Sequence, residues 1–219
     1  MRNLVLAAAA LAVAAPTVAN AAFVVTFPSS AAIPGPATPS NDFLLDLQAL
    51  GLFGFASTGA SIALDAADII DFYFMGSESG VTNTFQAYSV GPFNETDSNH
   101  FASGDNSPVL IGSEALLAGA FSATFLANGT DVVNIGNQQF GIATPSILAN
   151  GGSFTSNDIY FLLDDNPANG DDNHDDMIIR ATVRSAVPEP TTWAMMLGGF
   201  GIVGSLMRRR NVTTRVSFA

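Results

Sequence analysis

Short apolar runs separated by turn residues fill the middle of the chain and predict β-strands. Segments such as Gly76–Gly80 and Asn128–Thr130 supply the turns. Within Thr84–Val90, apolar side chains alternate with polar or small ones, which is typical of a strand with one buried face. The predicted strands span residues 69–75, 84–90, 119–127, 131–136, 139–143, 157–163 and 176–183. Strands at this spacing indicate a mainly β fold, an antiparallel β-sandwich or jelly-roll-like domain over residues 42–186.

Three other segments depart from this pattern. Residues 40–53 and 112–121 each favour a minor helix. Residues 22–41 are rich in proline and small residues, and we expect them to form a linker or an irregular edge.

The first 21 residues predict a cleaved signal peptide. Arg2 gives a short basic start, and the apolar run Leu4–Ala15 is too short to span a bilayer. Ala19 and Ala21 supply the small residues of the A-x-A pattern, so we expect signal peptidase to cut after Ala21. The chain is therefore expected to pass through the export machinery, with a signal-peptide helix at its N-terminus.

An uncharged segment near the C-terminus, Trp193–Met207, is followed by the arginines Arg208–Arg210. As a helix its 15 residues would rise roughly 22 Å, against a hydrocarbon core of about 30 Å. A helix that starts at Thr191 and continues into the arginines crosses marginally, because arginine side chains extend to the interface. The sequence therefore predicts a transmembrane helix in the inner membrane, with the arginines and the tail 211–219 in the cytoplasm. A buried C-terminal core helix is the alternative, which accounts poorly for the arginines.

Composition and charge narrow the possible function classes. Hydrophobic residues make up 48% of the chain and charged residues 12%, as expected for a globular domain rather than a disordered chain. The chain has no cysteine, which excludes disulfides and thiolate metal sites. Residues 22–188 hold 18 acidic and 2 basic residues, because Glu189 and the other five arginines lie outside this segment. The formal charge of the segment is therefore −16. A surface this acidic repels nucleic acid, which is excluded as a partner.

The segment 187–210 resembles the PEP-CTERM sorting signal, in the variant with Trp-Ala after the triplet. The matching residues are Pro188, Glu189, Pro190, Trp193, Ala194, the Gly-rich helix Leu197–Met207, and Arg208, Arg209 and Arg210. In that family an exosortase, an integral-membrane transpeptidase-like enzyme, recognises the tail and cleaves at or near the triplet.

The resemblance implies an exosortase substrate of a Gram-negative bacterium that makes exopolysaccharide. Such a protein is anchored transiently in the inner membrane and then reaches the cell surface or the extracellular matrix. A similar tail ends some ice-binding proteins, but it is a sorting tag and implies nothing about ice.

One acidic stretch, residues 160–183, stands out in the predicted β domain. It holds six aspartates between Asp164 and Asp176, and carboxylates packed so closely raise one another's pKa unless they are solvated or share a cation. Oxygen ligands in a flexible loop suit Ca²⁺, although the loop lacks the later Gly and Glu of an EF-hand. The candidate calcium ligands are Asp164, Asp165, Asp171, Asn173, Asp175 and Asp176. Two interpretations stay open, a calcium site that stabilises the fold and a solvated acidic hairpin.

Patterns typical of catalysis are missing from the sequence. His100 lies in a polar loop and His174 in the acidic hairpin, whereas zinc usually takes three protein ligands. No Gly-x-Ser-x-Gly elbow and no phosphate loop occurs. We therefore expect a non-enzymatic protein of the cell envelope or of a biofilm exopolysaccharide matrix, without a catalytic residue or a certain cofactor. The alternative is a secreted glycan-acting hydrolase that uses paired carboxylates.

Overall fold

The structure is a computed structural model of the chain, and its contacts divide the chain into two compact units. It describes residues 21–28, 31–32, 47–56, 58–95, 108–144, 151–166, 174–184, 190–208 and 217. Residues Asn20–Ser185 form one unit, here called the β domain, and the helix α2 (Pro190–Arg208) belongs to the other. Within the described part of the β domain the regular elements are strands apart from one helical turn at residues 47–49. The mainly β prediction is therefore confirmed.

The described strands of the β domain form three antiparallel sheets. They are β1 (Phe23–Phe27), β2 (Ala31–Ala32), β3 (Phe53–Ala56), β4 (Ser61–Leu64), β5 (Asp68–Gly76), β6 (Thr84–Ala87), β7 (Val90–Asn94), β8 (Val109–Leu116), β9 (Gly119–Phe121), β10 (Thr124–Ala127), β11 (Asp131–Asn134), β12 (Phe140–Thr144), β13 (Gly152–Ser156), β14 (Asp158–Leu163) and β15 (Met177–Val183). The β1 sheet has the order β13-β1-β4-β9, and the β10 sheet has the order β11-β10-β6-β7. The large sheet has the order β2-β3-β12-β14-β15-β5-β8.

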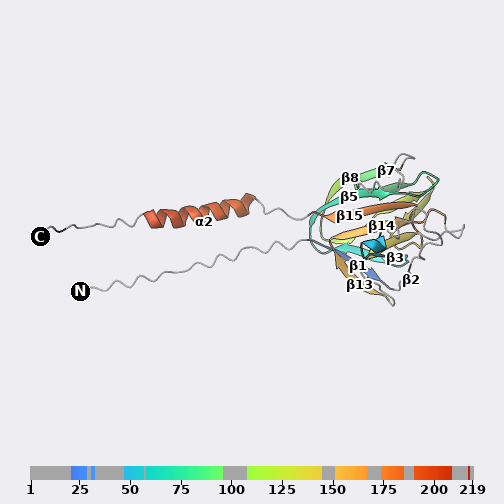
Figure 1. The fold of residues 1–219 in the computed structure, drawn as a ribbon, viewed down its shortest axis with the longest axis horizontal. Helices are drawn as coiled ribbons and strands as arrows, with labels where there is room; N and C mark the ends of the chain where they lie inside the picture. Colours follow the sequence, from blue (N-terminus) through green and yellow to red (C-terminus); the bar gives the residue numbers. More distant parts are fainter. Residues whose placement is uncertain are drawn as a thin grey trace. The chain divides into compact units, whose positions relative to one another are not determined.

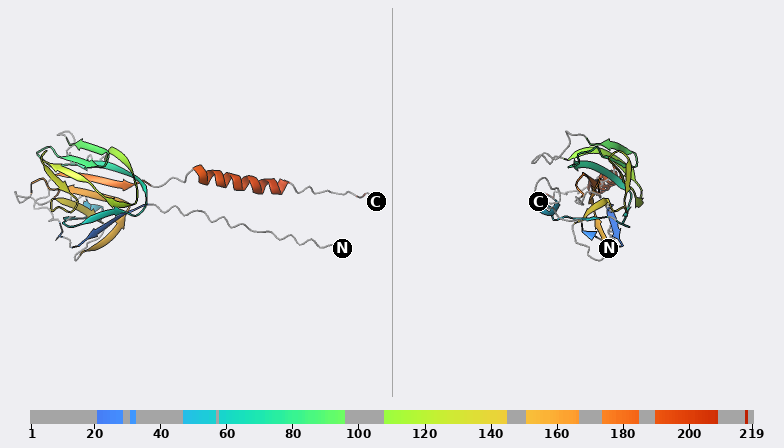
Figure 2. Two further views of the ribbon diagram at one scale, coloured as in Figure 1. Left: turned by 180° about the vertical axis from the view of Figure 1, so that it is seen from behind. Right: turned by 90° about the vertical axis from the view of Figure 1, so that its right-hand side faces the viewer.

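The figures show how these sheets are arranged within the β domain. Figure 1 shows β8, β5, β15 and β14 side by side in the large sheet. Figure 2 shows the same domain from behind and from one end, and in all views β7 and β8 lie at the opposite end from β1 and β13. The long strands β5 and β15 lie between these two groups and run alongside β8 in the large sheet.

Two strands in the middle of the large sheet, β14 and β15, are buried on both faces. Side chains from Ile159 to Leu163 are all buried, as are those of Met177–Ile179. One face packs into the main core, and the other forms a smaller cluster in which Tyr160 and Leu162 join Leu47 of the helical turn. Burial on two faces explains why these segments are continuous apolar runs rather than alternating ones.

Phenylalanine rings from all three sheets meet in the main core. The ring centroid of Phe161 lies 5.5 Å from that of Phe140, 5.8 Å from that of Phe121 and 6.3 Å from that of Phe85. Phe140 and Phe161 belong to the large sheet, Phe121 to the β1 sheet and Phe85 to the β10 sheet. A fully buried phenylalanine contributes roughly 1.5–3 kcal/mol, and each ring pair about 0.5–1.5 kcal/mol more. The aromatic cluster therefore joins the sheets into one core.

The predicted strand at Thr84–Val90 is wrong in one respect, because the chain turns within it. β6 and β7 form an antiparallel hairpin there. Tyr88 takes a positive φ of 53°, and its hydroxyl accepts a hydrogen bond from the amide of Ser122 at 3.1 Å. Gly91 has a φ of 100°, and a Cβ at this position would lie 2.6 Å from the carbonyl oxygen of Phe85. The hairpin therefore needs glycine at this position, which the alternation of side chains does not reveal.

The helix predicted over residues 112–121 is also wrong, because β8 and β9 occupy this segment. β8 pairs with β5 along Asp68–Phe74 and forms an edge of the large sheet. The strand predicted over residues 119–127 is divided in the same region, since β9 belongs to the β1 sheet and β10 to the β10 sheet. In both segments tertiary pairing overrides the local preference of the sequence.

The N-terminal segments differ from expectation as well. Residues 22–41, expected as a linker or irregular edge, contain β1, which lies between β13 and β4 with Phe23, Val25 and Phe27 buried. Of the helix predicted over residues 40–53, the described part is helical at residues 47–49 and enters β3 at Phe53. Residues 40–46 lie outside the described residues.

Candidate functional site

The candidate sorting residues lie at the two ends of α2. Pro190 is the first residue of the helix, where the missing N–H removes no hydrogen bond. Trp193 and Ala194 follow in its first turns, and Arg208 is its last residue. Pro188, Glu189, Arg209 and Arg210 lie outside the described residues.

The middle of α2 is uncharged and exposed. Met195, Leu197, Phe200 and Ile202 are each between 64% and 70% exposed. Gly198, Gly199, Gly201 and Gly204 separate these apolar side chains. The predicted transmembrane span is not found, since no helix among the described residues combines the length and apolarity needed to cross a membrane.

Four of the six candidate calcium ligands lie at the described ends of the β14–β15 hairpin. Asp164 and Asp165 follow β14, and Asp175 and Asp176 precede β15. Asp171 and Asn173 lie outside the described residues. Of the four described aspartates, Asp164 and Asp175 are buried.

The carboxylates of this hairpin accept hydrogen bonds from the chain itself. Asp176 Oδ2 accepts one from the amide of Asp165 at 2.7 Å, and Asp164 Oδ1 accepts one from the amide of Asn166 at 3.0 Å. Neutral donors of this kind stabilise the ionised form of a carboxylate. The described residues contain no group of three or more His, Asp or Glu side chains placed to hold a metal ion. The calcium site, which also requires Asp171 and Asn173, stays a prediction.

Asn83, which is fully buried at 0% exposure, connects the hairpin to the β10 sheet. Its Nδ2 donates to Asp165 Oδ2 at 2.9 Å, and the Ser79 hydroxyl donates to the same oxygen. The Asn83 side-chain oxygen accepts a hydrogen bond from the amide of Asn128 at 2.9 Å. The Asn83 amide donates to Glu95 Oε1 at 2.7 Å, and the Glu95 amide returns a hydrogen bond to the Asn83 carbonyl at 3.1 Å. We call Ser79, Asn83, Glu95, Asn128 and Asp165 the polar clamp.

Sequence reasoning identified Asp165 but missed the other members of the polar clamp. Asn83 looks like an ordinary turn residue, and its partners Asn128 and Asp165 follow 45 and 82 residues later. His174, considered above as a zinc ligand, is buried with its Nε2 2.9 Å from the carbonyl oxygen of Gln138. No local spacing in the sequence signals these contacts.

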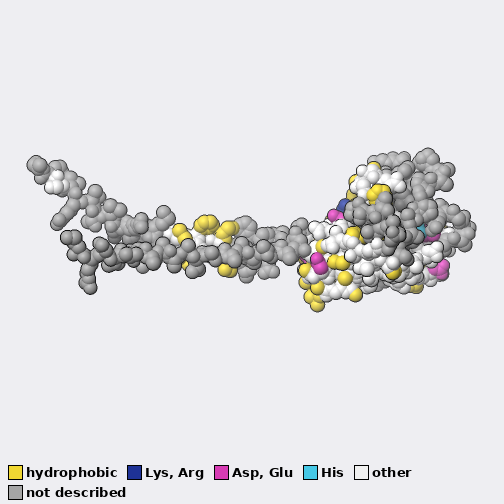
Figure 3. All heavy atoms as spheres, turned by 90° about the horizontal axis from the view of Figure 1, so that it is seen from below, with side chains coloured by type: hydrophobic (Ala, Val, Ile, Leu, Met, Phe, Trp, Pro, Cys, Tyr) yellow, Lys and Arg dark blue, Asp and Glu magenta, His cyan; other side chains and the backbone are white. Residues whose placement is uncertain are grey.

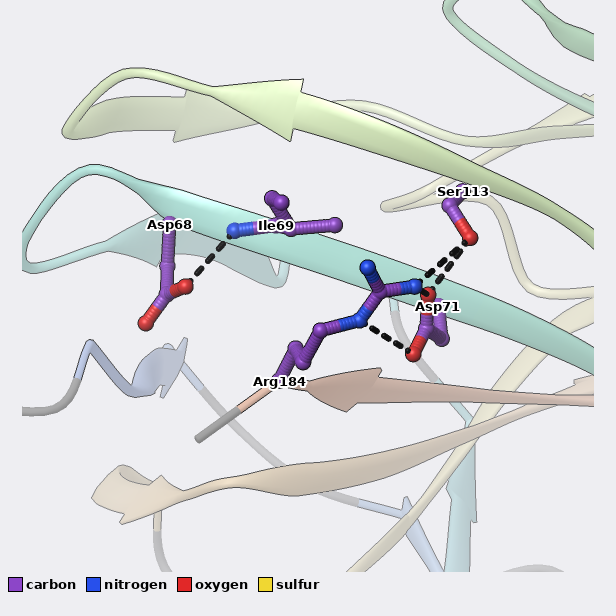
Figure 4. A network of polar contacts seen from close by, with 5 residues as sticks. All are labelled: Asp68, Ile69, Asp71, Ser113 and Arg184. Atoms are coloured by element: carbon purple, nitrogen blue, oxygen red, sulfur yellow. Dashed lines mark hydrogen bonds and ion pairs between the residues drawn. The ribbon is translucent and has the colours of Figure 1, made fainter. Parts of the chain in front are cut away.

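An ion pair fixes the end of β15, the last described segment of the β domain. Arg184 Nε donates to Asp71 Oδ2 at 3.0 Å, and its Nη2 donates to Asp71 Oδ1 and lies 3.1 Å from the Ser113 hydroxyl (Figure 4). Burial raises the pKa of Asp71, but hydrogen bonds from Arg184 and Ser113 and the charge of Arg184 bring that pKa below its usual value. Arg180 lies on the same strand with its guanidinium carbon 4.7 Å from the centre of the Tyr73 ring. Both basic residues of segment 22–188 therefore bind side chains of β5.

One of the two candidate leader cleavage residues, Ala21, lies at the start of the β domain. Ala21 is fully buried at 0% exposure, and Ala19 lies outside the described residues. The amide of Ala22 donates to Asp65 Oδ1 at 2.6 Å, and the amide of Asp65 donates to the Ala22 carbonyl oxygen at 3.1 Å. The first residue of the predicted mature chain is thus fixed beside the end of β4.

The acidic side chains do not gather in a single patch on the face of the β domain seen in Figure 3. They form separate small areas among neutral and apolar side chains there. The described residues on this face therefore present no single acidic patch.

Comparison with known proteins identifies the C-terminal segment. Residues 186–211 match a family model described as the PEP-CTERM protein-sorting motif. No curated protein and no solved structure matches the chain. The resemblance found in the sequence is therefore confirmed, and such a motif implies export to the cell envelope and processing by an exosortase.

Proposed function

We propose that this carrier of a PEP-CTERM motif is an exported, non-enzymatic component of the cell envelope. In this proposal signal peptidase removes residues 1–21, and an exosortase cuts at or near Pro188–Pro190. The protein then reaches the surface or the exopolysaccharide matrix of a Gram-negative cell. The sorting motif at residues 186–211 carries the proposal.

The boundary of the β domain supports access of the exosortase to the motif. The compact unit ends at Ser185 and the motif begins at residue 186. Arg184, bound to Asp71, is the last described residue before the motif. A membrane enzyme that binds a linear peptide needs that peptide outside the folded domain, and this boundary provides it.

The character of α2 supports transient retention of the precursor at the inner membrane. The middle of the helix is uncharged and exposes Met195, Leu197 and Phe200, apolar side chains that favour contact with lipid over contact with water. The basic residues Arg208–Arg210 favour the cytoplasmic side of a membrane. Cleavage near the triplet would separate the β domain from this helix.

The use of buried polar groups supports a structural rather than a catalytic role. Asp165 and Glu95 bind amide and hydroxyl donors of the polar clamp, and Asp71 binds Arg184. Phenylalanine rings fill the interior where the three sheets meet. Carboxylates committed to fixed donors inside a fold stabilise it, and they are poorly placed to exchange protons with a substrate.

Intact-mass measurement on protein from the native host tests the proposal. We expect a mature form that lacks residues 1–21 and the segment from about Glu189 onward. A strain without exosortase should yield a form that keeps the C-terminal segment but lacks the leader. A mature protein that keeps Arg208–Arg210 in the exosortase-containing strain would refute the sorting step.

A further inference from the structure

Removal of the leader, which is part of the proposed function, creates a charged group directly before β1. The water oxygen bonds to the carbonyl carbon of Ala21 as the C–N bond to Ala22 breaks. Ala21 departs as a carboxylate, and the nitrogen of Ala22 takes up a proton to become an α-ammonium group. With Ala21 still attached, Ala22 is only 7% exposed. The new charge therefore forms at the margin of the packed domain, where a neighbouring carboxylate stabilises it.

Asp65 already occupies the position that such a partner needs. Its Oδ1 lies 2.6 Å from the nitrogen of Ala22, and its own amide donates to the Ala22 carbonyl oxygen at 3.1 Å. Asp65 directly follows β4, which pairs with β1 in a register that sets Phe23 opposite Leu64. The sheet therefore holds the nitrogen and the carboxylate together.

We infer that Asp65 is the binding site for the new amino terminus, and that the resulting ion pair exists only in the mature protein. In the precursor the nitrogen is a neutral amide with one hydrogen to donate. After cleavage it carries a positive charge and three hydrogens, so the contact that it forms with Asp65 is a charge-assisted hydrogen bond, which is stronger than a neutral one.

The strands next to this contact offer no other charged partner for the Ala22 nitrogen among the described residues. The strands that flank β1, namely β4 and β13, carry no charged side chain. Beyond β13, Asp158 uses its Oδ1 to accept a hydrogen bond from the Thr182 hydroxyl at 2.6 Å. Among the described residues, the carboxylate hydrogen-bonded to this nitrogen is that of Asp65.

Burial of this region also fixes the order of events. Ala21 packs in the main core, and both backbone polar groups of Ala22 are bound to Asp65. A protease must hold the residues around its cleavage site in an extended form, so the folded domain shields this bond. The cut therefore precedes the docking of β1, and the ion pair forms when β1 docks.

The chain contains no lysine, so the mature protein has a single primary amine. Reductive methylation with ¹³C-formaldehyde therefore labels the amino terminus alone. NMR titration of the labelled methyl groups then reports the pKa of this amine, whose ordinary value is about 7.7–8.0 before methylation. Intact mass and N-terminal sequencing of the same sample first establish which residue carries the label.

Three variants of the mature protein complete the test. Asp65→Asn removes the charge of the partner, Asp65→Glu keeps it, and Asp131→Asn removes an exposed carboxylate on β11 of a different sheet. We expect the amine pKa to fall by at least about half a unit in Asp65→Asn and to stay near the wild-type value in Asp131→Asn. In Asp65→Glu the pKa of the amine should return most of the way to the wild-type value.

A measurement on the wild type alone covers the case in which Asp65→Asn does not fold. Raising the salt from about 0.05 M to about 1 M should lower the amine pKa, because salt screens the pair. Equal pKa values in wild type and folded Asp65→Asn, or a salt-independent value, would overturn the pairing and leave the proposed processing intact. An amino terminus other than Ala22 would overturn the pairing together with the proposed leader site, and the exosortase step would stand.

Discussion

The β domain and the C-terminal sorting segment differ in how far apart their cooperating residues lie. The residues of the sorting segment fall within positions 188–210 of the sequence. In the β domain, Ser79 reaches Asp165 across 86 residues and Arg184 reaches Asp71 across 113. A signal that another enzyme binds as a peptide must be local and lie outside the fold. Groups that hold a fold together can be scattered along the chain.

The largest expected effect is a loss of sorting that leaves the stability of the β domain unchanged. Replacing Arg208, Arg209 and Arg210 together with glutamine should abolish membrane retention of the precursor and its cleavage, because it removes the positive charge that we propose holds the tail in the cytoplasm. The melting temperature of the β domain should change little, as for other substitutions away from packed contacts. Protease accessibility, intact mass and thermal melting measure the two outcomes.

Arg215→Gln is the matched control for this experiment, since it removes a nearby arginine outside the cluster. Retention and processing should continue in this variant. Normal cleavage of the triple variant, or a clear loss of domain stability in it, would remove the distinction between the regions.

The next effect tests whether the polar clamp stabilises the β domain. Asn83→Leu keeps the size of the side chain but leaves Asp165 Oδ2 and the amide of Asn128 without the donor and acceptor that Asn83 supplies. We expect a loss of about 2–4 kcal/mol in the free energy of unfolding, because buried polar groups lose their partners. Urea unfolding of the mature protein provides the measurement.

Asn94→Leu serves as the control, because Asn94 is exposed at the end of β7 and its side chain accepts a hydrogen bond from Thr84. Its cost should stay below about 0.5 kcal/mol. Similar losses for both substitutions would show that the clamp adds nothing beyond an exposed hydrogen bond.

A third experiment tests the calcium site, which would make the hairpin sensitive to a ligand. Calcium bound only to the folded state stabilises it by about 2.7 kcal/mol at a hundredfold excess over the dissociation constant. The mature protein should then melt at a higher temperature in calcium than in chelator, and Asp171→Asn with Asp175→Asn should remove the difference. Sodium at equal ionic strength is the control, since it only screens charge. Equal melting temperatures in calcium and in chelator would show that calcium does not stabilise the hairpin.

The smallest effect concerns the pH dependence that the ion pair at the end of β15 confers. The pKa of Asp71 is lower in the folded protein than its ordinary value of about 3.9. The stabilisation is therefore complete above that ordinary value and is lost as the pH falls through the lower folded value. Arg184→Gln should reduce stability at neutral pH and flatten its decline below about pH 4.

Melting temperature measured from about pH 2 to pH 7 checks this expectation. Asp131→Asn is the control, because it removes an exposed carboxylate on β11, in a different sheet from the ion pair. If the melting temperature of Arg184→Gln fell below about pH 4 as steeply as that of the wild type, the ion pair would not contribute to stability in acid.

The sequence predicts those parts of the protein whose pattern is local. The strands β5, β14 and β15 are visible because burial on one or both faces leaves long apolar runs. The sorting motif is visible because its residues are consecutive. The aspartates of the acidic hairpin are also conspicuous, but their partners Ser79 and Asn83 are not.

Other parts could not be predicted because distant pairing decides them. The helix expected over residues 112–121 is strand because β5 binds its backbone. The segment that begins at Phe23 reads as a linker but becomes an inner strand because β13 and β4 enclose it. At Tyr88 the alternation continues through a turn, so periodicity gives no sign of the hairpin.

The pairing of the first strand has a kinetic consequence. Phe23 of β1 lies opposite Ser156 of β13, and Ile70 of β5 lies opposite Val183 of β15. Both sheets therefore have a high contact order, and chains dominated by such pairings fold in milliseconds to seconds rather than microseconds. A chain that crosses a membrane from its N-terminus cannot complete the β1 sheet before Ser156 of β13 has emerged. The topology itself thus delays the docking of β1, and under the proposed processing it keeps the start of this strand open to the enzyme that removes the leader.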